Sequence, residues 1–334
     1  MTIKRNLKKS DLYWSEAIEI IPAGTQTLSK SPLQSVMGVA PKYIIKGQGS
    51  HVWDVDNNEY IDYSMGGGPV ILGHNYPAVT DAVKDQIENG NSFIMMHPLE
   101  IEVAKLMNDC IPCSEMVRFG KNGSDATYGT VRVARGFTGR DKIASSGYHG
   151  WHDWSIGITE RNKGIPKAIS DLTLPFDFND IGQVEKLFKE NKNEIAGVII
   201  EPALHDEPEK NYLQELKELT HENGAVLIFD EVWTGFRWDL GGAQKYYGVE
   251  ADISAFGKAM GNGVPISSIV GSKEVMSEMN TEVFFSSTFG GECLGLAASK
   301  ATINENKNKC VTDHIKKLNK KLKSGYTIFW VRLT

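Results

Sequence analysis

The sequence predicts an α/β fold, with a mostly parallel sheet covered by helices. From about residue 76 onward, helical stretches alternate with short apolar runs, and this alternation is typical of parallel strands joined by helices. Polar residues follow several of the apolar runs, where a ligand crevice is expected in such a sheet. The predicted helices are 77–89, 98–109, 124–136, 180–190 and 212–223. The predicted strands are 116–119, 142–145, 196–200, 225–229, 252–256 and 266–270.

The N-terminal part has a different pattern. Residues 11–24 are predicted to form an amphipathic helix that ends at the Pro22 to Gly24 segment. Residues 52–55 and 60–63 are mostly apolar or aromatic and flank the turn-forming residues 56–59. We therefore expect short antiparallel strands here.

The end of the chain is unusual. Residues 292–323 are predicted to be helical and include a lysine-rich amphipathic stretch, whereas 326–334 form an apolar run with the composition of a strand. No later segment could pair with such a strand or cover it. We therefore expect a truncated or frameshifted chain.

Composition limits the class of protein. The 334 residues are 41% hydrophobic and 23% charged, and the net charge is −6. An acidic balance argues against a nucleic-acid-binding protein. No apolar run reaches the roughly 18 residues of a membrane span, and the basic N-terminus is followed by no apolar signal core. We expect a cytoplasmic protein that acts on small molecules.

Two residues carry the strongest chemical signal. Lys258 follows the predicted strand 252–256, and Asp230 ends the predicted strand 225–229. Loops at the carboxyl ends of parallel strands line the same crevice, so both side chains are expected at one rim. A lysine with an acidic partner for a ring nitrogen is what a pyridoxal phosphate site requires.

A second signal is the segment Asn122-Gly123-Ser124, between a predicted strand and a predicted helix. Free backbone N–H groups at a helix start favour an anion such as phosphate. Simple helix capping explains the same residues and stays open at this point.

A third signal is the segment that contains Tyr148 and His149, after another predicted strand. Tyr148 could stack on a flat cofactor ring, and His149 is a candidate cofactor contact. Metal binding by His149, His152 and Asp153 is the alternative. Their spacing does not place all three on one helical face, so we predict no metal site.

Taken together, these segments resemble the class III, fold-type-I pyridoxal-phosphate aminotransferases. The chain is most similar to glutamate-1-semialdehyde aminomutase and to related aminotransferases of polysaccharide pathways, from about residue 14 to about 305. The resemblance rests on Lys258, on Asp230-Glu-Val-Trp-Thr-Gly-Phe236, and on the segments 137–143 and 71–74.

The resemblance implies roles for the residues around the cofactor ring. Lys258 would form the Schiff base with pyridoxal 5′-phosphate and move the proton between substrate and cofactor. Asp230 would pair with the pyridine nitrogen. Val232 would pack on one face of the ring, and Tyr148 would stack on the other.

It also implies phosphate contacts. Asn122, Gly123 and Ser124 would hold the phosphate at the helix start. Thr288 would reach the phosphate of the neighbouring subunit, which implies a homodimer with shared active sites. Glu201 would lie close to the cofactor.

The family organisation implies three parts. Residues 1–62 would be an N-terminal segment belonging to a small α+β domain, and 63–305 the large cofactor-binding domain. Residues 306–334 would begin the C-terminal part of the small domain, the rest of which we expect to be missing.

Two positions depart from the aminomutase pattern. Lys30 stands where the pattern has an arginine for the substrate carboxylate, and a lysine offers only a point charge. Gly67 replaces an aromatic pocket residue, which predicts a more open pocket. Both differences favour a general aminotransferase that moves an amino group from an amino acid to a carbonyl acceptor. An intramolecular aminomutase and a catalytically silent truncated homologue remain the alternatives.

Overall fold

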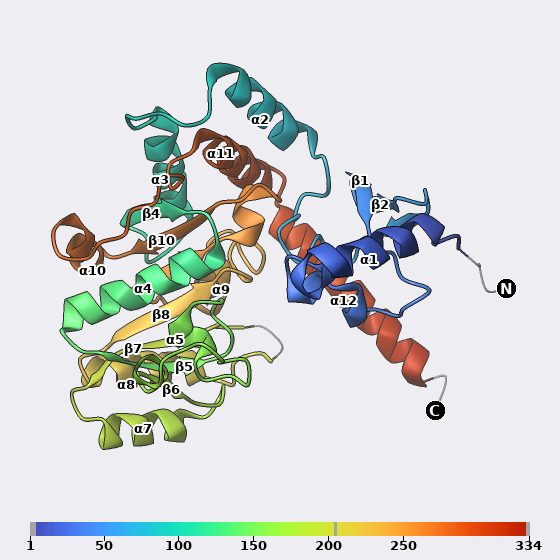
Figure 1. Cartoon of the computed structure of the whole chain (residues 1–334). Coiled ribbons are helices and arrows are strands. Elements are labelled where there is room, and N and C mark those ends of the chain that lie inside the picture. Colours follow the sequence, from blue (N-terminus) through green and yellow to red (C-terminus); the bar gives the residue numbers. More distant parts are fainter. Residues whose placement is uncertain (1–4, 204–205, 332–334) are drawn as a thin grey trace.

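A seven-stranded sheet forms the centre of the computed structural model, which describes residues 5–203 and 206–331 (Figure 1). The strand order is β4-β10-β9-β8-β7-β5-β6. The strands are β4 (Met116–Gly120), β5 (Lys142–Ser146), β6 (Thr173–Pro175), β7 (Ile195–Ile200), β8 (Val226–Glu231), β9 (Ile253–Phe256) and β10 (Ser267–Gly271).

The sheet is mostly parallel, as predicted. The pairs β5–β6, β5–β7, β7–β8 and β8–β9 are parallel. Strand β10 is antiparallel to both β9 and β4, so β4 runs in the same direction as β9. The carboxyl ends of β4, β5, β7, β8 and β9 therefore meet at one edge of the sheet.

Both faces of the central strands are buried, which explains their continuous apolar sequences. Because side chains alternate along a strand, Ile199 and Ile228 face one cluster while Ile200 and Phe229 face the other. The first cluster contains residues of helix α4 (Gly123–Thr138), and the second contains residues of α7 (Ile181–Glu190) and α8 (Tyr212–Glu222).

The other predicted helices are also present, as α2 (Pro77–Asn89) and α3 (Pro98–Cys110). Several short elements were not predicted, because one turn of helix leaves little periodicity to detect. They are α5 (Asp153–Ile156), α6 (Lys167–Ser170), α9 (Gly242–Tyr247), α10 (Lys273–Met276) and the 3₁₀ turns η4 (Lys258–Gly261) and η5 (Ser277–Asn280).

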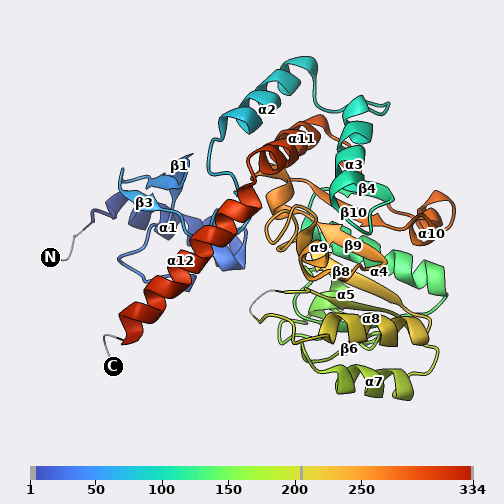
Figure 2. The ribbon, with the colours of Figure 1, turned by 180° about the vertical axis from the view of Figure 1, so that it is seen from behind.

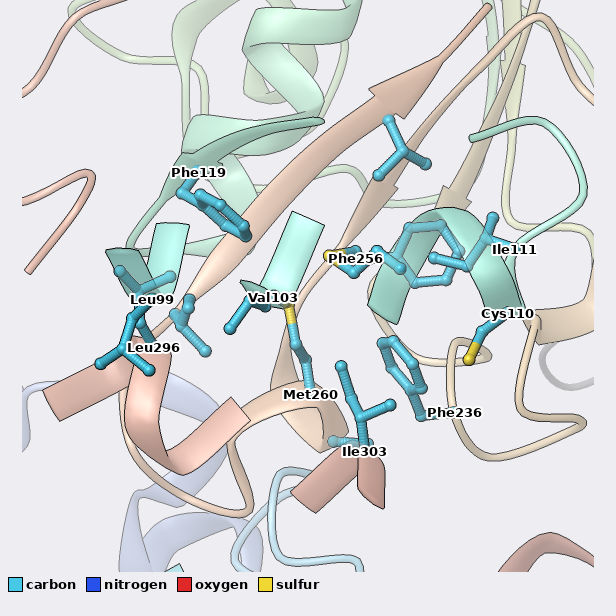
Figure 3. Packing of buried hydrophobic residues seen from close by; sticks show 14 of the residues in the cluster. Leu99, Val103, Cys110, Ile111, Phe119, Phe236, Phe256, Met260, Leu296 and Ile303 are labelled. Carbon is cyan, nitrogen blue, oxygen red and sulfur yellow. The ribbon is translucent and has the colours of Figure 1, made fainter. Parts of the chain in front are cut away.

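A third apolar cluster fixes the start of η4. Met260 is fully buried and packs with Phe236, Phe256, Val103 and Ile303, which come from distant parts of the chain (Figure 3). Lys258, two residues before Met260, is therefore attached to a rigid support.

The N-terminal part lies to one side of the sheet, seen in blue in Figure 1. Helix α1 (Lys8–Ile20) ends earlier than predicted, and a separate 3₁₀ turn, η1 (Pro22–Gly24), follows it. The expected antiparallel strands form a three-stranded sheet of β1 (Ile44–Gln48), β2 (His51–Asp54) and β3 (Glu59–Ile61). The turns η2 (Leu28–Lys30) and η3 (Pro32–Gln34) lie between α1 and β1.

The prediction of a strand at the end of the chain was wrong. Helix α11 (Cys293–Asn308) is followed by α12 (Val311–Val331), which continues through the apolar run (Figure 2). Extending an existing helix adds a hydrogen bond per residue, whereas a lone strand has no partner to supply its hydrogen bonds. Residues 332–334 of that run lie outside the described residues. Within the described ranges, no helix combines the length and apolar character needed to cross a membrane.

Candidate active site

The predicted functional residues meet at the carboxyl edge of the sheet. Asp230 lies near the end of β8, Glu201 directly follows β7, and Lys258 follows β9 after one glycine. The Asn122–Ser124 turn follows β4, and the Gly147–Trp151 loop follows β5. Five strands thus deliver one element each to the same edge, where ligands bind in open α/β sheets.

Asp230 is held by two hydrogen bonds and is only 4% exposed. Its Oδ1 accepts from the backbone N–H of Val232 at 3.0 Å, and its Oδ2 lies 2.8 Å from Nδ1 of His149. Nε2 of His149 lies 3.0 Å from the carbonyl oxygen of Ser146, so both ring nitrogens have a partner. The carboxylate is therefore fixed in one orientation.

His149 therefore positions the carboxylate of Asp230. The imidazole is 2% exposed and is stacked with Trp154, at 6.0 Å between ring centroids. Both of its ring nitrogens are occupied by Asp230 and Ser146, which leaves none for a metal ion. The contact that the structure shows is with Asp230, and the predicted contact of His149 with a cofactor stays a prediction.

Lys258 has an unusual backbone conformation and a perturbed amine. Its φ is +40°, a left-handed conformation that side chains other than glycine rarely adopt and that is enriched at functional sites. Burial lowers the pKa of the amine from 10.5 to about 8, although the charges of Asp230 and Glu201 oppose this change. The site therefore contains a lysine that is partly neutral near physiological pH.

Glu201 is the second perturbed acid. It is 8% exposed, and burial together with the negative charge of Asp230 raises the pKa of its carboxyl to about 7. Its Oε1 would lie 3.5 Å from a Cβ placed on Gly147. Perturbed groups of both signs around one lysine are characteristic of a catalytic site.

The Asn122–Ser124 turn caps helix α4 and also leaves two backbone N–H groups free. Asn122 and Asp125 form a capping box at the start of α4. The backbone N–H groups of Gly123 and Ser124 make no hydrogen bond to any described residue and remain available for an anion. A Cβ on Gly123 would lie 2.8 Å from Cγ1 of Val232, so a larger residue cannot occupy this position.

The loop after β5 packs on this turn. The N–H of Trp151 donates to Oγ of Ser124 at 3.2 Å, and Oγ1 of Thr127 donates to the carbonyl of His149 at 2.6 Å. Tyr148, directly before His149 in the loop, is 61% exposed, and burial of the remaining part raises the pKa of its phenol. Its ring is therefore free to cover a ligand.

The structure brings the two candidate substrate residues together. A Cβ on Gly67 would lie 3.6 Å from Cε of Lys30, and Lys30 is exposed. Thr288 is also exposed, in the segment between η5 and α11.

Two residues of the site were not predicted. The ring centroid of Trp233 lies 3.9 Å from Nζ of Lys258, and the guanidinium of Arg237 faces the same indole at 5.5 Å. Both stand in the turn after Asp230. The glycine run 66–68 was the sequence feature that could have indicated a bulky side chain at this site. Glycines often mark positions where another part of the chain approaches closely.

Comparison with known proteins agrees with this geometry. Residues 35–328 match the aminotransferase class-III family model. A 3-aminobutyryl-CoA aminotransferase from Cloacimonas acidaminovorans is 40% identical, over 91% of this chain and 74% of the relative. A glutamate-1-semialdehyde 2,1-aminomutase from Archaeoglobus fulgidus is 40% identical, over 96% of this chain and 79% of the relative.

Solved structures show the same fold. An omega-transaminase from Sphaerobacter thermophilus has a TM-score of 0.83 at 29% identity, covering 90% of this chain and 74% of that one. A transaminase with bound pyridoxal phosphate has a TM-score of 0.83 at 28% identity, with the same coverage. The chain belongs to the class-III aminotransferases, enzymes of the pyridoxal-phosphate-dependent, fold-type-I group.

Proposed function

We propose that this protein transfers an amino group from an amino-acid donor to a carbonyl acceptor, using pyridoxal 5′-phosphate bound at Lys258. The observation that carries the proposal is the pairing of a partly neutral lysine with a fixed carboxylate, Asp230, at one edge of the sheet. A neutral amine is required for attack on a carbonyl, and a fixed carboxylate suits a protonated ring nitrogen.

The residues present fit this cofactor. The free N–H groups of Gly123 and Ser124 would bind its phosphate, with Asn122 at the same helix start. Asp230 would accept a hydrogen bond from the ring nitrogen, and Val232 and Tyr148 would cover the two faces of the ring. When bound, pyridoxal phosphate supplies an electron sink for the carbon that loses its proton.

The chain itself supplies proton transfer and orientation. Lys258 would take the proton from the substrate carbon and return it at the adjoining position. His149 keeps Asp230 oriented through the 2.8 Å contact. Glu201, as an anion next to Lys258, favours the protonated form of the amine and so balances the effect of burial.

The substrate side favours an aminotransferase over an aminomutase. Lys30 offers an exposed positive charge for an anionic group, and the adjoining Gly67 leaves space beside it. An absorbance experiment tests the proposal: L-glutamate is expected to bleach the visible band of the cofactor-loaded protein, and a ketone or 2-oxo acid to restore it. Conversion of glutamate-1-semialdehyde to 5-aminolevulinate without a separate donor would instead establish the aminomutase.

The rate of cofactor capture is expected to depend on pH with a midpoint near pH 8. Lys258 must be neutral to react, and its neutral fraction rises as pH passes through the lowered pKa of about 8. Glu201→Gln removes a negative charge that raises this pKa, so its midpoint is expected at lower pH. The growth of the visible band after mixing with pyridoxal phosphate, followed at a series of pH values, measures the capture rate of the wild type and of Glu201→Gln. Glu190→Gln, on the surface of α7, is the control, and an unchanged midpoint in Glu201→Gln would contradict the assignment.

We extend the proposal to a homodimer whose subunits share active sites through Thr288. An apolar surface supports this extension. The segment 93–96 is strongly exposed, with Ile94 at 99%, and it adjoins the start of α11, where the N–H of Cys293 donates to the carbonyl of Asn91 at 2.9 Å. Met95 and Met96 in the same segment are exposed as well.

Ile94→Asp is expected to convert the dimer to monomers, because a charge buried at an apolar interface has no partner. Light scattering coupled to gel filtration measures the mass. Ile45→Asp, an exposed position on β1, is expected to leave the mass unchanged. A monomeric wild-type protein, or a dimeric Ile94→Asp variant, would refute this interface.

A further inference from the structure

The indole of Trp233 lies directly beside the reacting amine. Its ring centroid is 3.9 Å from Nζ of Lys258, within the range of a cation–π contact. The ring also lies against the glycine run 66–68, where a Cβ on Gly68 would be 2.6 Å from Cζ3 of the indole. Gly68 also has a φ of +98°, so both the conformation and the space require glycine.

Arg237 holds Trp233 and the glycine run 66–68 in their relative positions. Its Nε donates to the carbonyl of Trp233 at 2.9 Å, and its Nη2 donates to the carbonyl of Gly68. The guanidinium carbon lies 5.5 Å from the indole centroid. The partly buried guanidinium of Arg237 thus joins the turn after β8 to the glycine run, and these contacts hold the indole in place.

The position of the indole differs from that of an ordinary core residue. Trp233 is partly exposed, whereas Phe236, three residues later, is fully buried in an apolar cluster. The indole therefore faces the space next to the Lys258 amine, where the carbon that carries the substrate nitrogen must lie.

We propose that Trp233 is a specificity-determining residue of the proposed transamination. Its indole forms a fixed wall beside the reacting nitrogen and excludes amines that carry a bulky group, such as an aryl ring, on the wall side of the reacting carbon. The preferred amines thus carry a small substituent on the side of the reacting carbon that faces the indole. This proposal rests on the proposed function.

The test compares the wild type with Trp233→Ala, using L-alanine as a small anionic amine and 1-phenylethylamine as a bulky one. Single-turnover bleaching of the visible band yields the specificity constant for each amine. Trp233→Ala is expected to raise the ratio of the bulky to the small constant by about tenfold or more, the scale of steric exclusion in a pocket. An equal loss with both amines would show that Trp233 only supports the fold, and would overturn the proposal.

A second measurement tests whether the Trp233 indole lies beside the cofactor, and it requires no turnover. Tryptophan fluorescence is expected to fall when pyridoxal phosphate binds, and Trp233→Phe is expected to lose part of that decrease. Trp53→Phe is the matched control, because its indole also lies under a lysine, at 4.8 Å from Nζ of Lys46, but on β2. If fluorescence fell by the same amount in Trp233→Phe as in the wild type, Trp233 would not lie beside the cofactor, and the proposal would be refuted.

The two measurements separate the two proposals. A wild-type protein that binds the cofactor but reacts with no amine would contradict the proposed transamination, and the fluorescence result would still decide the position of Trp233. A protein that reacts with amines but shows an unchanged size preference in Trp233→Ala would contradict the wall alone.

Discussion

Lys258→Ala is expected to abolish transamination, with a loss of roughly 10⁴-fold or more in kcat. The variant loses both the amine that attaches the cofactor and the group that moves the substrate proton. Binding of pyridoxal phosphate is expected to persist at reduced affinity, because the phosphate turn and Asp230 are unchanged. Absorbance titration measures the binding, and the rate of band bleaching by L-glutamate measures the activity.

Lys273→Ala is the matched control for this experiment. Lys273 is exposed at the start of α10 and does not contact the carboxyl edge of the sheet. It is expected to bind and react as the wild type does. Retention of substantial activity in Lys258→Ala would contradict the whole assignment of the site, including the interpretation of its lowered pKa.

Asp230→Asn is expected to lower kcat by roughly 10²–10³-fold, the scale of losing one preorganised electrostatic contact in an active site. The amide keeps the shape of the carboxylate but cannot hold the ring nitrogen in its protonated form. The cofactor dissociation constant is expected to change less than kcat. Removing the negative charge also lowers the pKa of Lys258, so cofactor capture is expected to shift to lower pH.

Asp252→Asn provides the comparison at the opposite edge of the same sheet. Asp252 immediately precedes β9 and accepts hydrogen bonds from the backbone of Leu227 and from His221. It is expected to retain the wild-type kcat. If the two variants lost activity to the same extent, the effect of Asp230→Asn would be structural, and the proposed role at the ring nitrogen would fail.

The central sheet was predictable because its strands are both short and apolar, and because helices separate them. Buried parallel strands need apolar residues on both faces, so β7 and β8 stand out in the sequence. The antiparallel direction of β10 was not predictable. Its apolar run carries no information about direction, which is set by how the loop after Lys258 returns to the sheet.

The placement of the candidate site residues at one edge of the sheet was predictable for a related reason. Asp230, Lys258 and the Asn122–Ser124 turn each follow a recognisable strand, and parallel topology brings strand ends together. The final helix shows the limit of this approach. The apolar composition of 326–331 favours a strand, but the preceding helix simply continues through it.

The sequence by itself determined the α/β class, the family, and which lysine and which aspartate stand at the carboxyl edge. Only the tertiary structure decided that His149 orients Asp230, that Trp233 covers the Lys258 amine, and that Arg237 joins Trp233 to Gly68. Arg237 and Gly68 are 169 positions apart in the chain. Contacts of this kind depend on the packing of distant segments, which local periodicity does not encode.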